Sequence, residues 1–220
     1  ASEQGHHAIA FDMDPLAALM TRVWTTPIST RRLRDAAVNI ARQAETLNSA
    51  SVDLPWIDNE QETTDFINYW FGPSQQSELR RLSSLLVNFP GPVGDAMMLA
   101  LSRLIITKKR GASLAWDVSH SRPHKKKEEN DFPVISEFIK SVNFLAKRLE
   151  EQPPVGNVRV GIADARQLKS VADSSVDAVW FARGGYGSNR IAEAAVADLP
   201  DAARSKVYVG YSDAGFLRLA

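Results

Sequence analysis

The chain has 220 residues, of which 44% are hydrophobic and 24% are charged, and its formal net charge is zero. This composition is typical of a globular protein with one sizeable core. The sequence contains no cysteine, which excludes disulfides, thiolate metal sites and a cysteine nucleophile and fits a reducing compartment. A zero net charge also excludes a global attraction to nucleic acid or membranes, so a charged partner must bind a local patch.

The sequence carries no signal for a membrane or for export. No apolar run approaches the roughly 18 residues that a membrane-spanning helix needs. The N-terminus also lacks the basic and then apolar order of a signal peptide. We therefore expect a cytoplasmic protein with no membrane partner, and the sequence leaves its oligomeric state open.

The first predicted unit is a strand, a turn and a helix. An apolar run at residues 7–11 predicts the strand, and Pro15 suits the first turn of the helix that follows. A short polar lead stands directly before this strand. We therefore expect that a preceding strand and its turn are missing.

Residues 29–150 predict a large helical insertion. Ser29 or Thr30 is expected to cap a helix that extends to residue 47, while residues 49–62 predict a loop. Later helices are expected at 74–87, 93–106 and 131–150, with an irregular stretch at 112–130. The expected buried positions of the first and last helix are Leu33, Ala37, Ile40, Ala41, Ala44, Phe138, Val142, Leu145 and Leu149.

The hydrophobic period changes after Pro153-Pro154. Short runs at 158–162, 176–181 and 206–209 predict strands, and the alternation with helices favours a parallel sheet with crossover connections. The predicted fold class is therefore α/β: a Rossmann-like parallel sheet with a large helical insertion, incomplete at its first strand and glycine-rich turn.

Two acidic residues follow predicted strands, Asp12 and Asp164. A carboxylate at the carboxyl end of a strand in such a sheet can accept hydrogen bonds from the ribose hydroxyls of a nucleotide. The alternative for Asp12 is a structural one, because an Asp before a helix commonly caps it.

Several segments in order resemble S-adenosylmethionine-dependent DNA methyltransferases of the exocyclic-amino type. They are Ala8–Ala17, Asn68-Tyr69-Trp70-Phe71, the helix at 93–106, Val160–Arg166 and Ser175-Val176-Asp177. The resemblance spans residues 1–178 and implies S-adenosylmethionine as cofactor, with Asp12 and Asp14 at its ribose and Asp164 at its adenine amino group. The catalytic Asp/Asn-Pro-Pro-aromatic motif is replaced by Phe181–Tyr186, so we expect catalysis to be incomplete.

The stretch from Arg103 to Lys127 is strongly basic, with Asp117 as its one acid. It predicts a loop that contacts DNA phosphates, and a solvated loop is the alternative. His120 and His124 are interpreted as polar loop residues, and no metal site is expected. The candidate nucleic-acid residues are Lys108, Lys109, Arg110, Arg122, Lys125, Lys126 and Lys127.

The last part of the chain, residues 176–220, resembles the LD-carboxypeptidases, or muramoyltetrapeptide carboxypeptidases, which trim peptidoglycan peptides. The similar segments are Val176–Arg190 and Val207–Asp213. The resemblance implies Ser212 as nucleophile and Gly184 and Gly185 as the oxyanion region. It also implies a Glu and a His from a C-terminal domain that would follow Ala220. A phosphate-binding turn and a helix cap are the structural alternatives for these residues.

Three hypotheses follow from these patterns. The first is a methyltransferase-like segment over 1–178 that is catalytically incomplete. The second is a serine peptidase fragment over 176–220, and the third is a non-functional chimera of the two. Both families place a parallel strand at Val176–Trp180, so the joint is expected there.

Overall fold

The computed structural model describes residues 5–105, 107, 110–116, 124–125, 127–155, 157–163, 176–181, 201–204 and 206–210. Within these ranges the protein is mixed α/β and mostly helical, with small parallel sheets. The chain divides into two compact units. The first comprises residues 1–10 and 14–160, and the second comprises residues 11–13 and 161–220.

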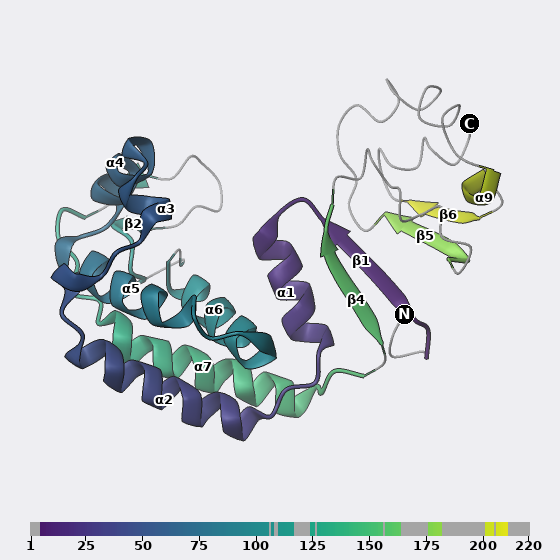
Figure 1. The fold of residues 1–220 in the computed structure, drawn as a ribbon, viewed down its shortest axis with the longest axis horizontal. Helices are drawn as coiled ribbons and strands as arrows, with labels where there is room; N and C mark the ends of the chain where they lie inside the picture. Colours follow the sequence, from purple (N-terminus) through teal and green to yellow (C-terminus); the bar gives the residue numbers. More distant parts are fainter. Residues whose placement is uncertain are drawn as a thin grey trace. The chain divides into compact units, whose positions relative to one another are not determined.

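Helices dominate the first unit (Figure 1). Most of the predicted helices form within one or two residues of their expected bounds. The helices are α1 (Pro15–Thr25), α2 (Thr30–Thr46), α3 (Pro55–Asp58), α4 (Gln61–Trp70), α5 (Pro73–Leu86), α6 (Gly91–Ile105) and α7 (Val134–Glu151).

The first two helices begin at side-chain caps that the sequence indicates. Asp14 Oδ1 accepts a hydrogen bond from the backbone N–H of Leu16 at 2.8 Å, and Pro15 occupies the first turn of α1. Ser29 Oγ accepts from the N–H of Arg32 at 3.4 Å and caps α2. Each cap satisfies a backbone donor that has no partner inside its helix.

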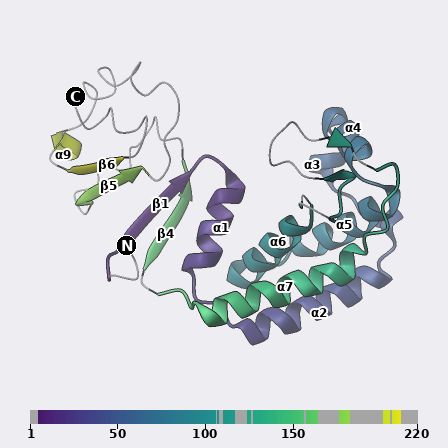
Figure 2. The same ribbon diagram turned by 180° about the vertical axis from the view of Figure 1, so that it is seen from behind.

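The core of the first unit lies among α2, α5, α6 and α7. Figure 2 shows α2 and α7 side by side along their length, and their many contacts agree. The sequence correctly predicts which positions of these two helices are buried. Side chains at the centre are fully or almost fully buried and include Leu33, Leu82, Met97, Phe138 and Leu145.

The prediction of a loop over 49–62 was wrong in part. A 3-10 turn forms at Ser49–Ser51, α3 begins at Pro55, and α4 begins at Gln61. Local hydrogen bonds explain these elements, since Asp58 Oδ2 accepts from the N–H of Leu54 at 2.8 Å. Such short capped turns have too few residues to produce a hydrophobic period.

The stretch expected to be irregular, 112–130, contains a short antiparallel pair. Strand β2 (Ala115–Trp116) pairs with β3 (His124–Lys125). A further bridge joins Phe71 to Ser113 in antiparallel fashion, and the N–H of Leu114 donates to the carbonyl of Trp70 at 2.7 Å. The basic stretch is therefore attached to the C-terminal end of α4.

The strands predicted early and late in the chain pair with one another. Strand β1 (Ala8–Asp12) neighbours β4 (Val158–Ile162). The N–H of Ala8 donates to the carbonyl of Asn157 at 3.0 Å, and that of Ala163 donates to the carbonyl of Asp12 at 3.2 Å. These bonds at the two ends show that β1 and β4 run parallel.

The second unit contains the parallel pair β5 (Ala178–Phe181) and β6 (Val207–Gly210), with the short helix α9 (Asp201–Arg204) before β6. The described residues thus form separate two-stranded sheets, and they do not form a complete Rossmann fold. The prediction of parallel pairing is confirmed, whereas one continuous Rossmann-like sheet is not found in the described part of the chain.

Candidate functional site

The two parallel strands of the second unit end side by side. Their register places Ala178 opposite Val207 and Phe181 opposite Gly210. In parallel strands both carboxyl ends lie at the same edge, which is where open α/β sheets bind ligands. The chain therefore leaves β5 and β6 at the same edge. In the sequence, Gly184 and Gly185 follow β5, and Ser212 follows β6.

Hydrogen bonds at the other end of the pair fix this register. The ammonium of Lys206 donates to the carbonyl of Val176, and the N–H of Val207 donates to the carbonyl of Asp177 at 3.2 Å. The backbone N–H of Lys206 also donates to the carbonyl of Ala203 at 3.3 Å. The start of β6 is thus held both to β5 and to α9.

The side chain of Tyr208 makes a second hydrogen bond between β6 and α9. Its phenol donates to the carbonyl of Ala203 at 2.8 Å, and burial raises the pKa of Tyr208 above its usual value. The neutral phenol is therefore favoured, and only the neutral form can donate this hydrogen bond.

The two faces of this pair differ in exposure. Trp180, Val207 and Val209 point to one face and are exposed, Trp180 by 73% of its surface. Val179 and Tyr208 alternate to the other face and are half-buried. Strands of parallel sheets are normally covered on both faces, and the apolar composition of β5 and β6 is typical of such strands.

The predicted peptidase residues Gly184, Gly185 and Ser212 lie outside the described residues, and so does Asp164. Their roles stay predictions. The structure brings residues near them in the sequence together in two places. Phe181 lies opposite Gly210, and the N–H of Ala163, the residue before Asp164, donates to the carbonyl of Asp12.

The two acids expected at the cofactor ribose differ in their surroundings. Asp12 is the last residue of β1 and is exposed. Asp14 caps α1, so at least one of its oxygens serves the helix. Binding of S-adenosylmethionine through Asp12, Asp14 and Asp164 remains a prediction.

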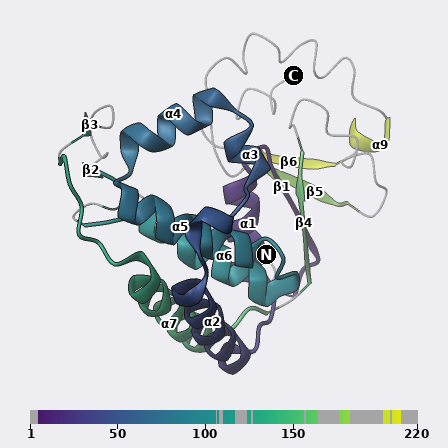
Figure 3. The ribbon, with the colours of Figure 1, turned by 60° about the vertical axis from the view of Figure 1, so that its left-hand side comes forward.

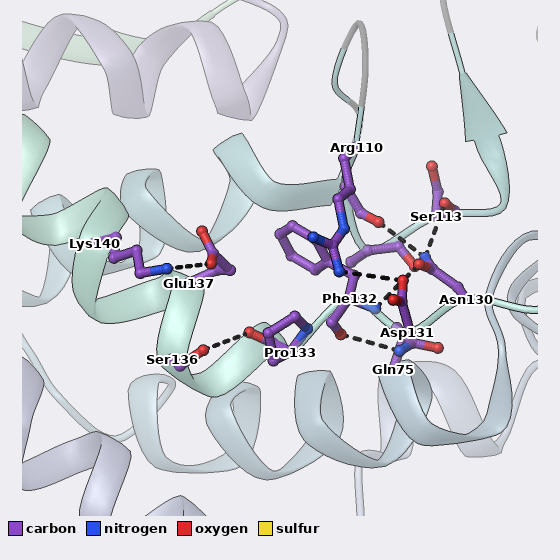
Figure 4. Close-up of polar contacts among 12 residues, drawn as sticks. Gln75, Arg110, Ser113, Asn130, Asp131, Phe132, Pro133, Ser136, Glu137 and Lys140 are labelled. Atoms are coloured by element: carbon purple, nitrogen blue, oxygen red, sulfur yellow. Dashed lines mark hydrogen bonds and ion pairs between the residues drawn. The ribbon is translucent and has the colours of Figure 1, made fainter.

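The basic stretch is less positive than its sequence suggests, because acids from neighbouring positions pair with it. Arg110 pairs with Asp131 (Figure 4), with Nη2 3.2 Å from Oδ1. Lys125 Nζ lies 3.0 Å from Glu128 Oε2. Glu128 and Asp131 lie one and four residues after Lys127, so the acids that pair with the basic stretch stand just beyond its end.

The other candidate DNA contacts are Lys108, Lys109, Arg122, Lys126 and Lys127. Lys108, Lys109, Arg122 and Lys126 lie outside the described residues, and the structure describes Lys127 as half-buried. Arg103 stacks its guanidinium 4.6 Å from the ring centroid of Phe144. DNA binding by this stretch stays a prediction.

The described part of the chain shows neither a metal cluster nor a membrane-spanning helix. Among those residues, no group of three or more His, Asp or Glu side chains is arranged to hold a metal ion. No helix in the described ranges has the length and apolar character needed to cross a membrane.

Comparison with known proteins favours the second of the three hypotheses. Residues 120–220 match the family model of the LD-carboxypeptidase N-terminal domain. The match includes α7, β4, β5, α9 and β6, and it starts well before the segment 176–220 that carries the resemblance in the sequence. No curated protein and no solved structure matches the chain. The comparisons give no support to a methyltransferase segment, and the division at 176–178 stays a prediction.

Proposed function

We propose that residues 120–220 are the nucleophile-bearing part of an LD-carboxypeptidase that acts on peptidoglycan peptides. The observation that carries the proposal is the parallel register of β5 and β6, with Phe181 opposite Gly210. This register supports an oxyanion turn at Gly184-Gly185 and a nucleophile at Ser212 that follow neighbouring strand ends. The family match over the same strands supports it independently.

The proposed chemistry is that of a serine peptidase. Ser212 Oγ attacks the carbonyl before the terminal D-residue and forms a C–O bond, while backbone amides at Gly184 and Gly185 stabilise the oxyanion. The C–N bond then breaks, and the proton of Ser212 passes through a base to the leaving amine. Water hydrolyses the acyl-enzyme and restores the serine.

Full turnover requires a general base that takes the proton of Ser212. The resemblance places a His, oriented by a Glu, in a C-terminal domain of the family. A serine without such a base is a weak nucleophile. We therefore expect residues 1–220 to bind the peptide, and we expect hydrolysis where they act together with such a domain.

A tetrapeptide assay tests the proposal. The chain is mixed with a peptidoglycan tetrapeptide, with and without the C-terminal domain of an LD-carboxypeptidase, and release of the terminal D-alanine is followed by mass spectrometry. Release is expected in the mixture, together with labelling of Ser212 by a fluorophosphonate. Ser212→Ala should abolish both signals, and Ser188→Ala is the matched control.

Two outcomes would contradict the proposal. One is the absence of D-alanine release from the mixture while the tetrapeptide also fails to bind the chain. The other is equal release or equal labelling by the Ser212→Ala variant, which would assign the reaction to another group.

A further inference from the structure

Helix α4 presents an outer face that combines aromatic rings with acids. Glu62, Asp65, Phe66 and Tyr69 are spaced by three and four residues, so they share one side of the helix. All four are exposed, Phe66 by 59% and Tyr69 by 55%. These four residues are called the α4 outer face below. Figure 3 shows α4 with β2 and β3 beside its C-terminal end.

The aromatic rings of Phe66 and Tyr69 pack against Trp70. Trp70 packs against the core, and its ring contacts both neighbours, with centroids 6.1 Å from Phe66 and 4.8 Å from Tyr69. The Tyr69 contact is edge-on, with an interplanar angle of 87°. Rings that are already ordered lose little freedom when a partner binds.

The sequence on both sides of α4 is acidic over a long stretch, and the basic stretch that carries Lys125 meets the helix at its C-terminal end. Residues 43–79 contain seven acids and no Lys, Arg or His. Two of these acids, Glu62 and Asp65, belong to the α4 outer face itself. Ring faces carry negative electrostatic potential, so rings and carboxylates together attract a cation. The face complements a positively charged partner.

The protein's own contacts illustrate this chemistry. The ammonium of Lys125 on β3 lies 5.7 Å from the ring centroid of Tyr69. Lys125 also pairs with Glu128, so it is shared between a ring and a carboxylate. A basic side chain is thus seated at one edge of the α4 outer face, while the ring of Phe66 remains exposed.

We propose that the α4 outer face is a docking surface for a basic, Lys- and Arg-rich segment of a partner protein. The guanidinium or ammonium groups of such a segment stack on Phe66 and Tyr69 and pair with Glu62 and Asp65. The surface lies outside residues 120–220, so this inference is independent of the proposed peptidase function.

Fluorescence anisotropy with the full chain tests the proposal. The probes are a labelled ten-residue peptide rich in Lys and Arg and a charge-reversed peptide rich in Glu. The basic peptide should bind and the acidic one should not, and raising NaCl from about 50 to about 500 mM should weaken binding. Tyr69→Ala and Phe66→Ala should each weaken binding about two- to five-fold, and Tyr69→Phe should retain it.

Charge variants keep the test valid if a ring variant does not fold. Glu62→Gln and Asp65→Asn alter exposed side chains and should weaken binding, whereas Asp35→Asn is the control on α2, where Asp35 is exposed and 3.9 Å from Arg31. Lys125→Gln uncovers Tyr69 and should bind the basic peptide at least as tightly as the unaltered chain. Circular dichroism confirms that each variant is folded.

Three results would overturn the proposal. The first is no binding of the basic peptide, and the second is binding that Tyr69→Ala, Glu62→Gln and Asp65→Asn leave unchanged. The third is concentration-dependent association of the chain with itself that Tyr69→Ala removes while the peptide does not bind, because the face would then belong to a second copy.

Discussion

The carboxylate of Glu150 on α7 accepts hydrogen bonds from both terminal nitrogens of Arg34 on α2. Arg34 Nη1 lies 2.6 Å from Glu150 Oε1, and Nη2 lies 2.9 Å from Oε2. Thr30 Oγ1 also donates to Oε1 at 2.7 Å. The hydrogen bonds from Arg34 and then from Thr30 lower the pKa of Glu150 from 4.5 to about 2. This group links the two longest helices of the first unit at their surface.

The lowered pKa predicts a pH-dependent contribution to stability. Because the folded-state pKa is depressed, the contribution is present above pH 4.5 and is lost as the pH falls toward about 2. Urea unfolding should therefore show a lower midpoint for Glu150→Gln than for the unaltered chain near neutral pH. The difference should shrink over this pH window and also in high salt, since the pair is exposed. Glu129→Gln, at an exposed position, is the control, and a pH-independent difference would contradict this account.

Gly94 in the first turns of α6 has no room for a side chain, because the backbone between α5 and α6 lies against it. A Cβ at this position would lie 1.9 Å from the backbone carbonyl oxygen of Phe89. Backbone atoms cannot rotate away as a side chain can, so Gly94→Ala should destabilise the fold by about 1–3 kcal/mol. Thermal unfolding measures the loss. Ser102→Ala is a control on the same helix, and an equal melting temperature for Gly94→Ala and the unaltered chain would show that the turn relaxes freely.

Asn130 organises the chain between α6 and α7. Its Nδ2 donates to the carbonyls of Gly111, Ala112 and Ser113 at 2.9, 3.0 and 3.2 Å, and its Oδ1 accepts from the N–H of Phe132 at 3.1 Å (Figure 4). Asn130→Asp replaces the donor with an oxygen that repels these carbonyls. We expect a loss of about 1–3 kcal/mol in free energy of unfolding, measured by urea titration at neutral pH.

A matched variant separates the donor from the volume of Asn130. Asn130→Ala removes both the donor and the acceptor but adds no repulsion, so it should cost less than Asn130→Asp. The opposite order would mean that packing, and not hydrogen bonding, holds this segment.

The helices could be predicted well because their signals are local. Ser29 caps α2 as expected, and Leu33, Ala37 and Ile40 are buried at the predicted spacing. The short elements between residues 49 and 62 could not be predicted. Local hydrogen bonds, such as the one from the N–H of Leu54 to the carboxylate of Asp58, stabilise them and leave no hydrophobic period in the sequence. Likewise, the antiparallel pair β2–β3 depends on contacts that no local pattern records.

The candidate site was predictable only in its framework. The apolar runs of β5 and β6 indicate parallel strands, but the pairing of Phe181 with Gly210 is a long-range relationship. The charge of the basic stretch is partly neutralised by Glu128 and Asp131, which pair with Lys125 and Arg110 from outside residues 103–127. The α4 outer face had a signal in the sequence, the seven acids of residues 43–79 without a cation.

A tertiary contact caps α7 in place of a local one. The helix follows Pro133, whose side chain cannot accept a hydrogen bond, and Glu78 of α5 takes this role. Glu78 Oε2 accepts from the N–H of Ile135 at 2.8 Å, where a carboxylate also complements the positive end of the helix dipole. Glu78→Ala should therefore lower the free energy of unfolding by about 1 kcal/mol, as the loss of a helix cap commonly does.

The conservative variant tells the two contributions apart. Glu78→Gln keeps an acceptor for Ile135 but removes the charge, so its loss should fall between those of the unaltered chain and Glu78→Ala. Urea unfolding with Glu129→Gln as the surface control measures all three. A Glu78→Gln protein as unstable as Glu78→Ala would assign the effect to charge alone, and full stability of Glu78→Ala would show that α7 begins without this cap.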